Sequence, residues 1–384
     1  MIVIASPTEG GVAAVACNVV RQMRDDGLQV LHIRVGDGED RQTRERASRR
    51  PPALVAAAAA WQVRRQLRGC EVAHLEIGRS SVGAFWFGIA AAFLRRRRDL
   101  VLVAHDPPHI VRAPGSGLLR TAPGWRDAVA HRVLAALLDR PLKAYLRSHV
   151  ARTVVLSDEA AALARRDAWP SVTVLDHGAG PPTPDAPPPS RGRHVLMAGF
   201  LGPGKGLDVL AEAWRRIGTP SLPLIVAGAA RRQDRQWLSR IAGVLDRCPS
   251  PPQWLGYVTD EQFADLVATA AVVVLPYRAA NPASGVLIRA LVEGRPVVAT
   301  RVPAALAEVE PGRTGLLVDI ADAGALAHAL RRLLAHPRLR DELGGAAAAR
   351  AAGRHSWRRH VDQLMAVYRG SGGRVGAGRE ERIP

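Results

Sequence analysis

The sequence predicts an α/β protein in which two doubly wound, Rossmann-like domains face each other across a cleft. Three observations support this prediction: short apolar runs alternate with helical segments, a proline-rich segment divides the chain, and a glycine-rich turn follows the first apolar run of the second half. With 384 residues, 47% of them hydrophobic, the chain exceeds the size that a single core usually reaches. We therefore expect two cores.

The first half contains short apolar runs with little polar alternation, which is typical of parallel strands buried on both faces. Helical segments between the runs imply right-handed crossovers within one sheet. We expect strands over Met1–Ala5, Gln29–Val35, Glu71–Glu76, Leu100–His105, Thr153–Ser157 and Val172–Leu175.

Residues 178–193 are rich in proline and glycine and cannot sustain a helix or a strand, so we expect an interdomain linker there. The second half repeats the strand pattern over Val195–Ala198, Pro223–Ala227, Gln253–Leu255, Val272–Leu275, Pro296–Ala299 and Gly315–Val318. This organisation predicts an N-terminal domain over residues 1–177 and a C-terminal domain over residues 194–368. The last helix can cross back to the N-terminal domain, and residues 369–384 read as a disordered tail.

A candidate phosphate-binding turn opens the second half. The strand ending at Ala198 leads into Gly199-Phe-Leu-Gly-Pro-Gly204-Lys205-Gly206 and then into an amphipathic helix. Glycines allow the backbone to approach an anion, the helix N-terminus presents unpaired N–H groups, and Lys205 adds a full charge. Only two of the 53 basic Lys and Arg residues are lysines, Lys143 and Lys205.

Two better-known phosphate motifs fit this turn poorly. Gly206 stands where a nucleotide-hydrolase P-loop needs a hydroxyl to hold magnesium. The glycine spacing also differs from that of a dinucleotide fingerprint. A turn whose glycines serve only packing remains the alternative.

Composition narrows the classes of ligand and compartment. The net charge of +18 is divided evenly between the two halves, so we expect no specific nucleic-acid binding, whereas anionic small molecules suit such a surface. Cys17, Cys70 and Cys248 form no pair with metal-ligand spacing, and we find no Asp-x-Asp pair, so we expect neither a metal nor a cofactor. The chain opens on a strand without a secretory signal, which favours the cytoplasm.

An apolar run over Val82–Leu94 precedes four arginines, Arg95 to Arg98. Thirteen residues are too few to span a bilayer as a helix, so we expect a helix buried against the sheet. The alternative is a helix end that rests on the surface of an anionic membrane.

Eight motifs follow one another in a recognisable order. They are Gly10-Gly11, His105-Asp106, Asp176-His177-Gly178, Gly199 to Gly206, Gly256 to Glu261, Val274 to Pro276, Ala283 to Val286 and Glu308 to Leu317. Together they resemble family 4 glycosyltransferases, which have the GT-B architecture of two Rossmann-like domains. The resemblance extends over most of the chain, to about Tyr368.

This resemblance implies that a nucleotide-diphosphate sugar binds chiefly to the second domain and an acceptor to the first. Lys205 is then catalytic, because it neutralises the diphosphate as it leaves. His105 is the second catalytic candidate, placed beside the sugar, with Asp106 on the acceptor side. Without the resemblance, a single histidine at a strand end is more often structural.

The resemblance also assigns donor-binding residues. Backbone N–H groups at Gly10 and Gly11 are expected to reach the phosphates, although an ordinary turn is the alternative. Ser284 can cap the following helix, and Tyr257 can stack on the base or pack in the core. The full expected donor-binding set is Gly10, Gly11, Gly204, Gly206, Tyr257, Val258, Ser284, Gly285 and Val286.

The chain departs from the family pattern at three positions. Asn281 and Arg289 stand where two glutamates usually face the sugar and the ribose, and Phe200 replaces a common arginine. Arginine has no acceptor atom for ribose hydroxyls, so ribose recognition must differ or be absent. Glu293 follows Arg289 by four positions and can pair with it on one helix face.

The overall expectation is a metal-independent glycosyltransferase that retains anomeric configuration. Its expected acceptor is a small natural product, such as a cationic or phosphorylated cyclitol, or an envelope glycolipid or polysaccharide. Peripheral contact with an anionic membrane is a further possibility. Two alternatives stay open: a catalytically weakened GT-B binding or partner subunit, and a nucleotide-sugar epimerase.

Overall fold

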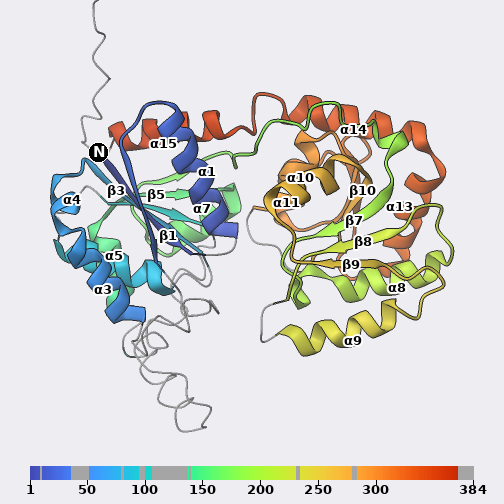
Figure 1. The fold of residues 1–384 in the computed structure, drawn as a ribbon, viewed down its shortest axis with the longest axis horizontal. Helices are drawn as coiled ribbons and strands as arrows, with labels where there is room; N and C mark the ends of the chain where they lie inside the picture. Colours follow the sequence, from blue (N-terminus) through green and yellow to red (C-terminus); the bar gives the residue numbers. More distant parts are fainter. Residues whose placement is uncertain are drawn as a thin grey trace, which may run out of the picture. The chain divides into compact units, whose positions relative to one another are not determined.

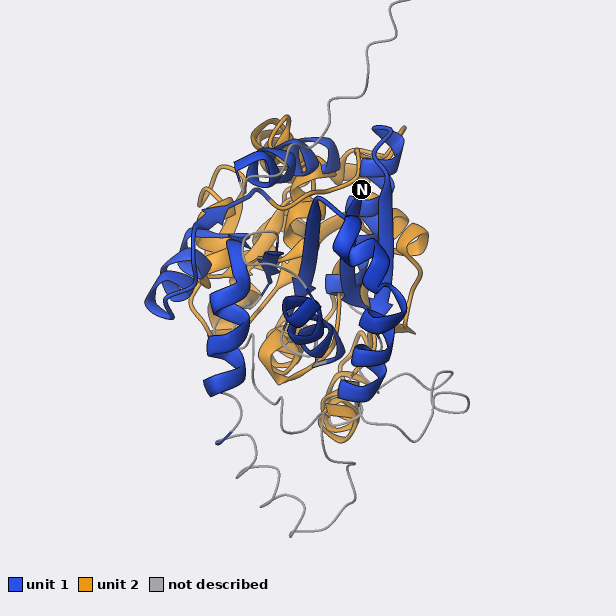
Figure 2. Ribbon diagram, turned by 90° about the vertical axis from the view of Figure 1, so that its left-hand side faces the viewer, with its two compact units in different colours: residues 1–176, 357–384 blue, residues 177–356 orange. Residues whose placement is uncertain are grey.

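The computed structural model describes residues 1–8, 11–35, 52–78, 82–94, 100–105, 137, 140–230, 234–278 and 283–370. The chain divides into two compact units (Figures 1 and 2). Unit 1 comprises residues 1–176 and 357–384, and unit 2 comprises residues 177–356. Within the described residues, no helix combines the length and the apolarity needed to cross a bilayer.

Unit 1 is built on a parallel six-stranded sheet with the order β2-β1-β3-β4-β5-β6. Its strands are β1 (Ile2–Pro7), β2 (Val30–Val35), β3 (Val72–Ile77), β4 (Leu100–Ala104), β5 (Val150–Val155) and β6 (Val172–Val174). Its labelled helices are α1 (Gly11–Asp25), α3 (Pro52–Gln62), α4 (Arg64–Gly69), α5 (Val82–Leu94), α7 (Asp158–Arg166) and α15 (Trp357–Gly370).

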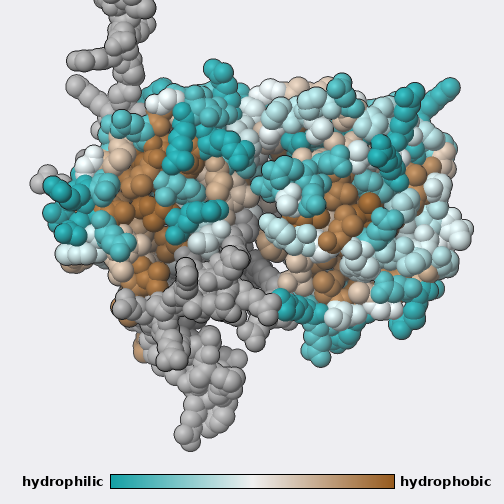
Figure 3. Space-filling view, viewed as in Figure 1, coloured by the Kyte–Doolittle hydropathy of each residue, from teal (hydrophilic) through white to brown (hydrophobic). Residues whose placement is uncertain are grey.

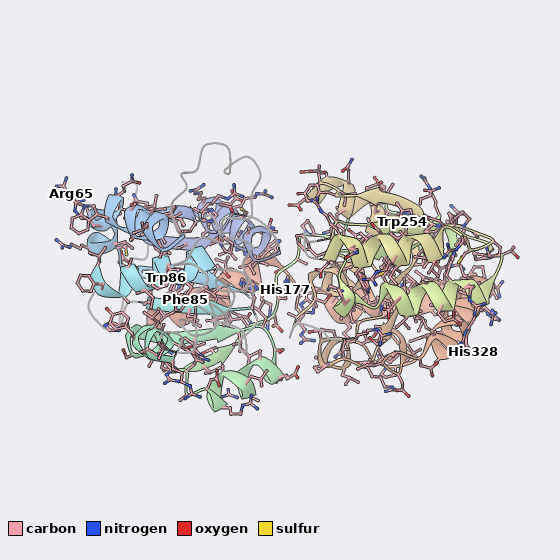
Figure 4. All side chains as sticks on the ribbon, turned by 90° about the horizontal axis from the view of Figure 1, so that it is seen from below. Arg65, Phe85, Trp86, His177, Trp254 and His328 are labelled. Atoms are coloured by element: carbon pink, nitrogen blue, oxygen red, sulfur yellow. The ribbon has the colours of Figure 1, made fainter. Side chains whose placement is uncertain are left out.

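Helices cover both faces of this sheet. Apolar residues of α3, α4, α5 and α7 form one core with alternate strand residues such as Val3 and Leu102. Phe85 and Trp86 of α5 are labelled in Figure 4 and pack edge to face. The opposite face, which includes Ile4 and Val103, packs against α1 and α15. Strands buried on both faces explain why the sequence shows apolar runs without alternation.

Unit 2 has a second parallel six-stranded sheet, with the order β12-β11-β10-β7-β8-β9. Its strands are β7 (His194–Ala198), β8 (Leu224–Ala227), β9 (Gln253–Gly256), β10 (Ala270–Leu275), β11 (Val297–Thr300) and β12 (Gly315–Val318). Its α-helices are α8 (Leu207–Ile217), α9 (Arg235–Leu245), α10 (Asp260–Ala268), α11 (Gly285–Val292), α12 (Pro303–Glu308), α13 (Ala323–Ala335) and α14 (Pro337–Ala351).

Alternate residues of β7 show how unit 2 is layered. Val195 and Met197 face a core that includes α8 and α13, whereas Leu196 and Ala198 face a core that includes α11 and α12. Each strand predicted from the sequence is present, and the prediction of two Rossmann-like domains is confirmed.

The proline-rich segment 178–193 packs as part of unit 2. Arg295 donates a hydrogen bond of 2.7 Å to the carbonyl oxygen of Pro187, and Arg340 donates bonds of 3.0 Å to those of Pro189 and Ser190. His177, which we expected to end the first domain, is grouped with unit 2, and α15 is grouped with unit 1. Most of the expected tail, residues 371–384, lies outside the described residues.

Candidate functional site

The strand order of unit 2 creates a topological switch point between β7 and β10. From β7 the chain continues outward on one side through β8 and β9, and on the other side through β10, β11 and β12. Ligands of open α/β sheets bind beside the carboxyl ends of the strands at such a point. The turn after β7 and the loop after β10 are therefore the candidate site of unit 2.

The glycine-rich turn is fastened to the loop after β10. Its residues Pro203–Lys205 form a single 3-10 turn, and the N–H group of Arg278 donates to the carbonyl oxygen of Gly204 at 3.0 Å. Gly206 has a φ of +68°, and a Cβ atom there would lie 1.7 Å from the carbonyl oxygen of Pro276. Only glycine allows both this left-handed conformation and this close approach.

Lys205 is held over an aromatic ring. Its Nζ atom lies 3.8 Å from the ring centroid of Tyr277, which is buried. The Tyr277 hydroxyl lies 3.2 Å from Ser284 Oγ, and Thr300 Oγ1 donates a hydrogen bond of 2.6 Å to the Tyr277 carbonyl oxygen. The nearby Arg278 pairs with Asp208, whereas no carboxylate within the described residues pairs with Lys205. No carboxylate of these residues therefore neutralises the ammonium group, which can attract an anion.

The N-terminus of α11 lies at the same edge. Ser284 caps this helix, accepting a hydrogen bond of 3.3 Å from the N–H group of Leu287, as predicted. A Cβ built on Gly199 would lie 3.6 Å from Val286 Cγ2, so the start of α11 adjoins the turn after β7. The structure thus brings together the predicted residues Gly204, Lys205, Gly206, Ser284, Gly285 and Val286, which combine a cation with a helix N-terminus.

The side chain of Arg289 forms its hydrogen bonds and its ion pair within unit 2. Its guanidinium donates to the carbonyl oxygens of Gly180 (3.2 Å) and Pro181 (2.9 Å) and pairs with Glu293, which confirms the predicted pairing on the helix face. Glu293 in turn accepts a bond of 3.1 Å from the N–H group of Thr183. These two residues therefore anchor the segment around residues 180–183 to α11.

The residues that we expected to contact the nucleobase of the donor follow β9 in the sequence. Tyr257 is 78% exposed, so its alternative assignment to the core is wrong, and Val258 packs against the α11 side of unit 2. Phe200 is also exposed. In unit 1, Gly11 begins α1 and has open space where a Cβ would lie. Gly10, Asp106 and Asn281 fall outside the described residues.

His105 belongs to a buried polar network in unit 1. It follows β4, and its Nε2 atom lies 2.5 Å from Glu76 Oε2 on β3. The other carboxylate oxygen lies 3.0 Å from His74 Nε2, and His74 Nδ1 lies 2.5 Å from the hydroxyl of Tyr368 on α15. Glu76, His74 and Tyr368 are fully buried or nearly so, whereas 11% of the His105 side chain is exposed.

The charge state of Glu76 follows from its neighbours. Burial alone would raise the pKa of Glu76, but the adjacent His74 and the hydrogen bond from His105 outweigh burial and lower it well below its ordinary value. Glu76 is thus an ionised, accept-only group. Burial, reinforced by the Glu76 charge, raises the pKa of the Tyr368 phenol, so Tyr368 keeps its proton.

Sequence reasoning missed Glu76, His74 and Tyr277. A signal was present for the first two: His74 and Glu76 are two residues apart in a strand predicted to be buried, so they share one face of the sheet. Nothing in the sequence separates Tyr277 from an ordinary core tyrosine. The described residues contain no group of three or more side chains suited to hold a metal ion.

Comparison with known proteins shows that unit 2 is similar to glycosyltransferases. Residues 192–336 match the protein family described as Glycosyl transferases group 1. A phosphatidyl-myo-inositol mannosyltransferase of Mycobacterium leprae is 32% identical over 183 residues, 47% of each chain. A D-inositol 3-phosphate glycosyltransferase of Geodermatophilus obscurus is 33% identical over 204 residues, 50% of this chain and 43% of that protein. The matches thus span about half the length of these relatives.

Solved structures agree on the fold. Sucrose-phosphate synthase from Thermosynechococcus elongatus has a TM-score of 0.70 at 19% identity, covering 96% of this chain and 98% of that one. The Anabaena protein HepE, solved with UDP and glucose, has a TM-score of 0.69 at 16% identity, covering 95% and 98%. These structures agree with the GT-B fold, and the family match over residues 192–336 supports the resemblance to family 4 glycosyltransferases.

Proposed function

We propose that this protein is a glycosyltransferase that moves a sugar from a nucleotide-diphosphate donor to an acceptor hydroxyl. One observation carries the proposal: the Lys205 ammonium, held on Tyr277 without a carboxylate partner in the described residues, lies in a glycine-rich turn beside the N-terminus of α11. Both features lie within the part that matches the glycosyltransferase family.

In this proposal, unit 2 supplies electrostatic catalysis. The leaving diphosphate gains negative charge as the bond to the sugar breaks, so Lys205 and the α11 N-terminus stabilise the transition state more than the bound donor. This arrangement takes the place of a divalent ion, and we propose transfer with retention. His105 in unit 1 serves a hydroxyl of the sugar or of the acceptor.

An anionic acceptor suits the chain best. The net charge is +18, and two relatives are named for phosphatidyl-myo-inositol and D-inositol 3-phosphate. A phosphorylated cyclitol, free or as a lipid headgroup, is therefore our proposed acceptor class.

Unit 1 offers a surface for the lipid form of such an acceptor. Figure 3 shows apolar side chains gathered on the face of unit 1 turned towards the viewer. Leu54 and Trp61 on α3 and Phe93 on α5 are exposed, and Arg64 of α4 stacks on Trp61 at 4.7 Å. Apolar and cationic side chains together favour peripheral contact with an anionic membrane.

A binding or partner subunit is the second candidate, and Arg289 favours it. Where the family usually presents a ribose-binding carboxylate, this chain has a guanidinium that is already occupied by Gly180, Pro181 and Glu293. A protein that binds nucleotide diphosphates but transfers no sugar would fit that substitution.

Thermal-shift measurements with nucleoside diphosphates and nucleotide sugars test the proposal. We expect a rise in Tm for the wild type that is lost in Lys205→Ala. Lys143→Ala is the matched control, because Lys143 pairs with Asp167 in unit 1 and should leave the response intact. Sugar transfer from the stabilising donor to inositol phosphates then separates the enzyme from the binding subunit. Equal responses in both lysine variants would refute the assigned site.

A further inference from the structure

Glu76 gives His105 a defined chemical form. The Glu76 carboxylate is ionised and can only accept hydrogen bonds, so the His105 nitrogen that faces it at 2.5 Å must carry a proton. That nitrogen is Nε2. In the neutral imidazole the other nitrogen, Nδ1, is therefore unprotonated and is an acceptor.

A second histidine lies beside the other carboxylate oxygen. His74 Nε2 is 3.0 Å from Glu76 Oε1, a close contact without hydrogen-bond geometry, and His74 Nδ1 lies 2.5 Å from the hydroxyl of Tyr368 on α15. The hydrogen bond to His105 is therefore the one that orients the Glu76 carboxylate, and His74 and Tyr368 pack around it.

Two other histidines near the Glu76 carboxylate do not compete with His105 for its hydrogen bond. His32 on β2 bonds to Ser6 Oγ at 2.8 Å, and burial and the charge of Arg34 lower its pKa. His360 on α15 bonds to the carbonyl oxygen of Asp176 at 2.7 Å, and burial lowers its pKa as well. The lowered pKa values favour the neutral form of both rings, and neither ring makes a hydrogen bond to Glu76.

We propose that Glu76 is the positioning residue of His105: it keeps the ring proton on Nε2 and leaves Nδ1 to accept a hydrogen bond from a substrate hydroxyl at the carboxyl edge of the unit 1 sheet. This inference rests on the proposed function for the identity of the substrate, but the state of the ring can be measured without any substrate.

The first test is the tautomer of His105 in the whole protein. Long-range proton–nitrogen spectra of the protein labelled with ¹⁵N-histidine, recorded at alkaline pH, distinguish the two tautomers, and His105→Gln identifies the signal. We expect the Nε2–H form in the wild type. Glu76→Gln should give a mixture, because an amide both donates and accepts, and Glu76→Asp should restore the Nε2–H form at least in part.

A second histidine–carboxylate pair, in which the histidine is buried and the carboxylate is partly exposed, provides the control. His355 Nε2 lies 3.2 Å from Glu308 Oε2 in unit 2, and Glu308→Gln should leave the His105 signal unchanged. An Nδ1–H tautomer in the wild type, or the same tautomer in wild type and Glu76→Gln, would overturn the inference. The wild-type spectrum tests the predicted Nε2–H tautomer of His105 even if a variant folds poorly.

The second test is a double-mutant cycle on turnover. Glu76→Gln should lower kcat/KM by about 10- to 100-fold, as loss of a partner that orients a functional histidine commonly does. In the His105→Gln background the same change should have less than about a twofold effect, because Glu76 acts through His105. An equal loss in both backgrounds would show that Glu76 only supports the fold. If the wild type transfers no sugar, the proposed function fails, while the tautomer measurement still decides this inference.

Discussion

At the scale of single residues, Gly206 shows how closely the glycine-rich turn after β7 packs against the loop after β10. Replacing it with alanine places a Cβ 1.7 Å from the carbonyl oxygen of Pro276 and forces a left-handed backbone on a residue with a side chain. The left-handed conformation alone costs about 1–2 kcal/mol, and the displacement of backbone adds to it. We expect Gly206→Ala to lower the free energy of unfolding of unit 2 by about 3 kcal/mol in urea titrations.

Gly353, also in unit 2, is the matched control for this prediction. Its φ of +70° is close to that of Gly206, but a Cβ there meets no atom within 4 Å. Gly353→Ala should therefore cost only the conformational part, about 1–2 kcal/mol. Equal losses in the two variants would show that the contact with Pro276 is relieved at no cost.

His360 predicts how unit 1 responds to acid. Its Nδ1–H bonds to the carbonyl oxygen of Asp176, whereas its buried Nε2 has no hydrogen-bond partner within the described residues. Burial lowers its pKa below the ordinary value, so as the pH falls through about 6.5 the unfolded chain binds a proton that the folded ring refuses. The free energy of unfolding should therefore fall between about pH 7 and 5, and less so in His360→Gln.

The control for this pH dependence is His328, an exposed residue of α13 that is labelled in Figure 4. His328→Gln should leave the slope of stability against pH unchanged in urea titrations at each pH. A slope in His360→Gln as steep as in the wild type would mean that Nε2 finds a proton-accepting partner in solution.

At the scale of elements, α11 joins the candidate donor site to the proline-rich segment. Its first turn provides Ser284 and Gly285, and its last turns hold the segment through Arg289 and Glu293. Glu293→Gln leaves the largely buried Arg289 without its counter-charge, and breaking such a pair costs about 3 kcal/mol. We expect lower stability of unit 2 and faster proteolysis within residues 178–183.

An exposed glutamate provides the control for the loss of one negative charge in the Glu293→Gln variant. Glu212 on α8 pairs with Arg215 and Arg216 at the surface, so Glu212→Gln should change neither stability nor proteolysis measurably. Faster cleavage in this variant too would argue against a specific role of α11 in holding the segment.

The helices and strands could largely be predicted from the sequence, whereas the His105–Glu76–His74–Tyr368 network of unit 1 could not. Apolar runs such as Val195–Ala198 identify strands because burial on both faces removes polar residues from them. The Lys205 turn was predictable because glycines and a charge adjoin in sequence. Glu76 and Tyr368, by contrast, are almost 300 residues apart, and only packing of α15 on the first sheet brings them into one network. No local pattern encodes such a contact.

At the scale of the whole molecule, α15 lets the end of the chain complete the first domain. It follows unit 2 in sequence, yet Val361, Leu364 and Tyr368 are buried in the core between the unit 1 sheet and α1. Burial of an apolar side chain contributes about 1.5–3 kcal/mol, so three of them approach the stability of an ordinary domain, about 5–15 kcal/mol. Truncation after Ser356 should therefore unfold unit 1 while unit 2 keeps its own core.

Calorimetry of the truncated chain checks this prediction, because the transition that belongs to unit 2 should persist and the other should disappear. Thermal stabilisation by nucleoside diphosphates, which we assign to Lys205, should also persist. Leu364→Ala provides a graded version, with an expected loss of about 3 kcal/mol confined to unit 1. If the truncated chain kept both transitions, the first sheet would be stable without α15, and Tyr368 could not be required to hold the His74–Glu76–His105 network in place.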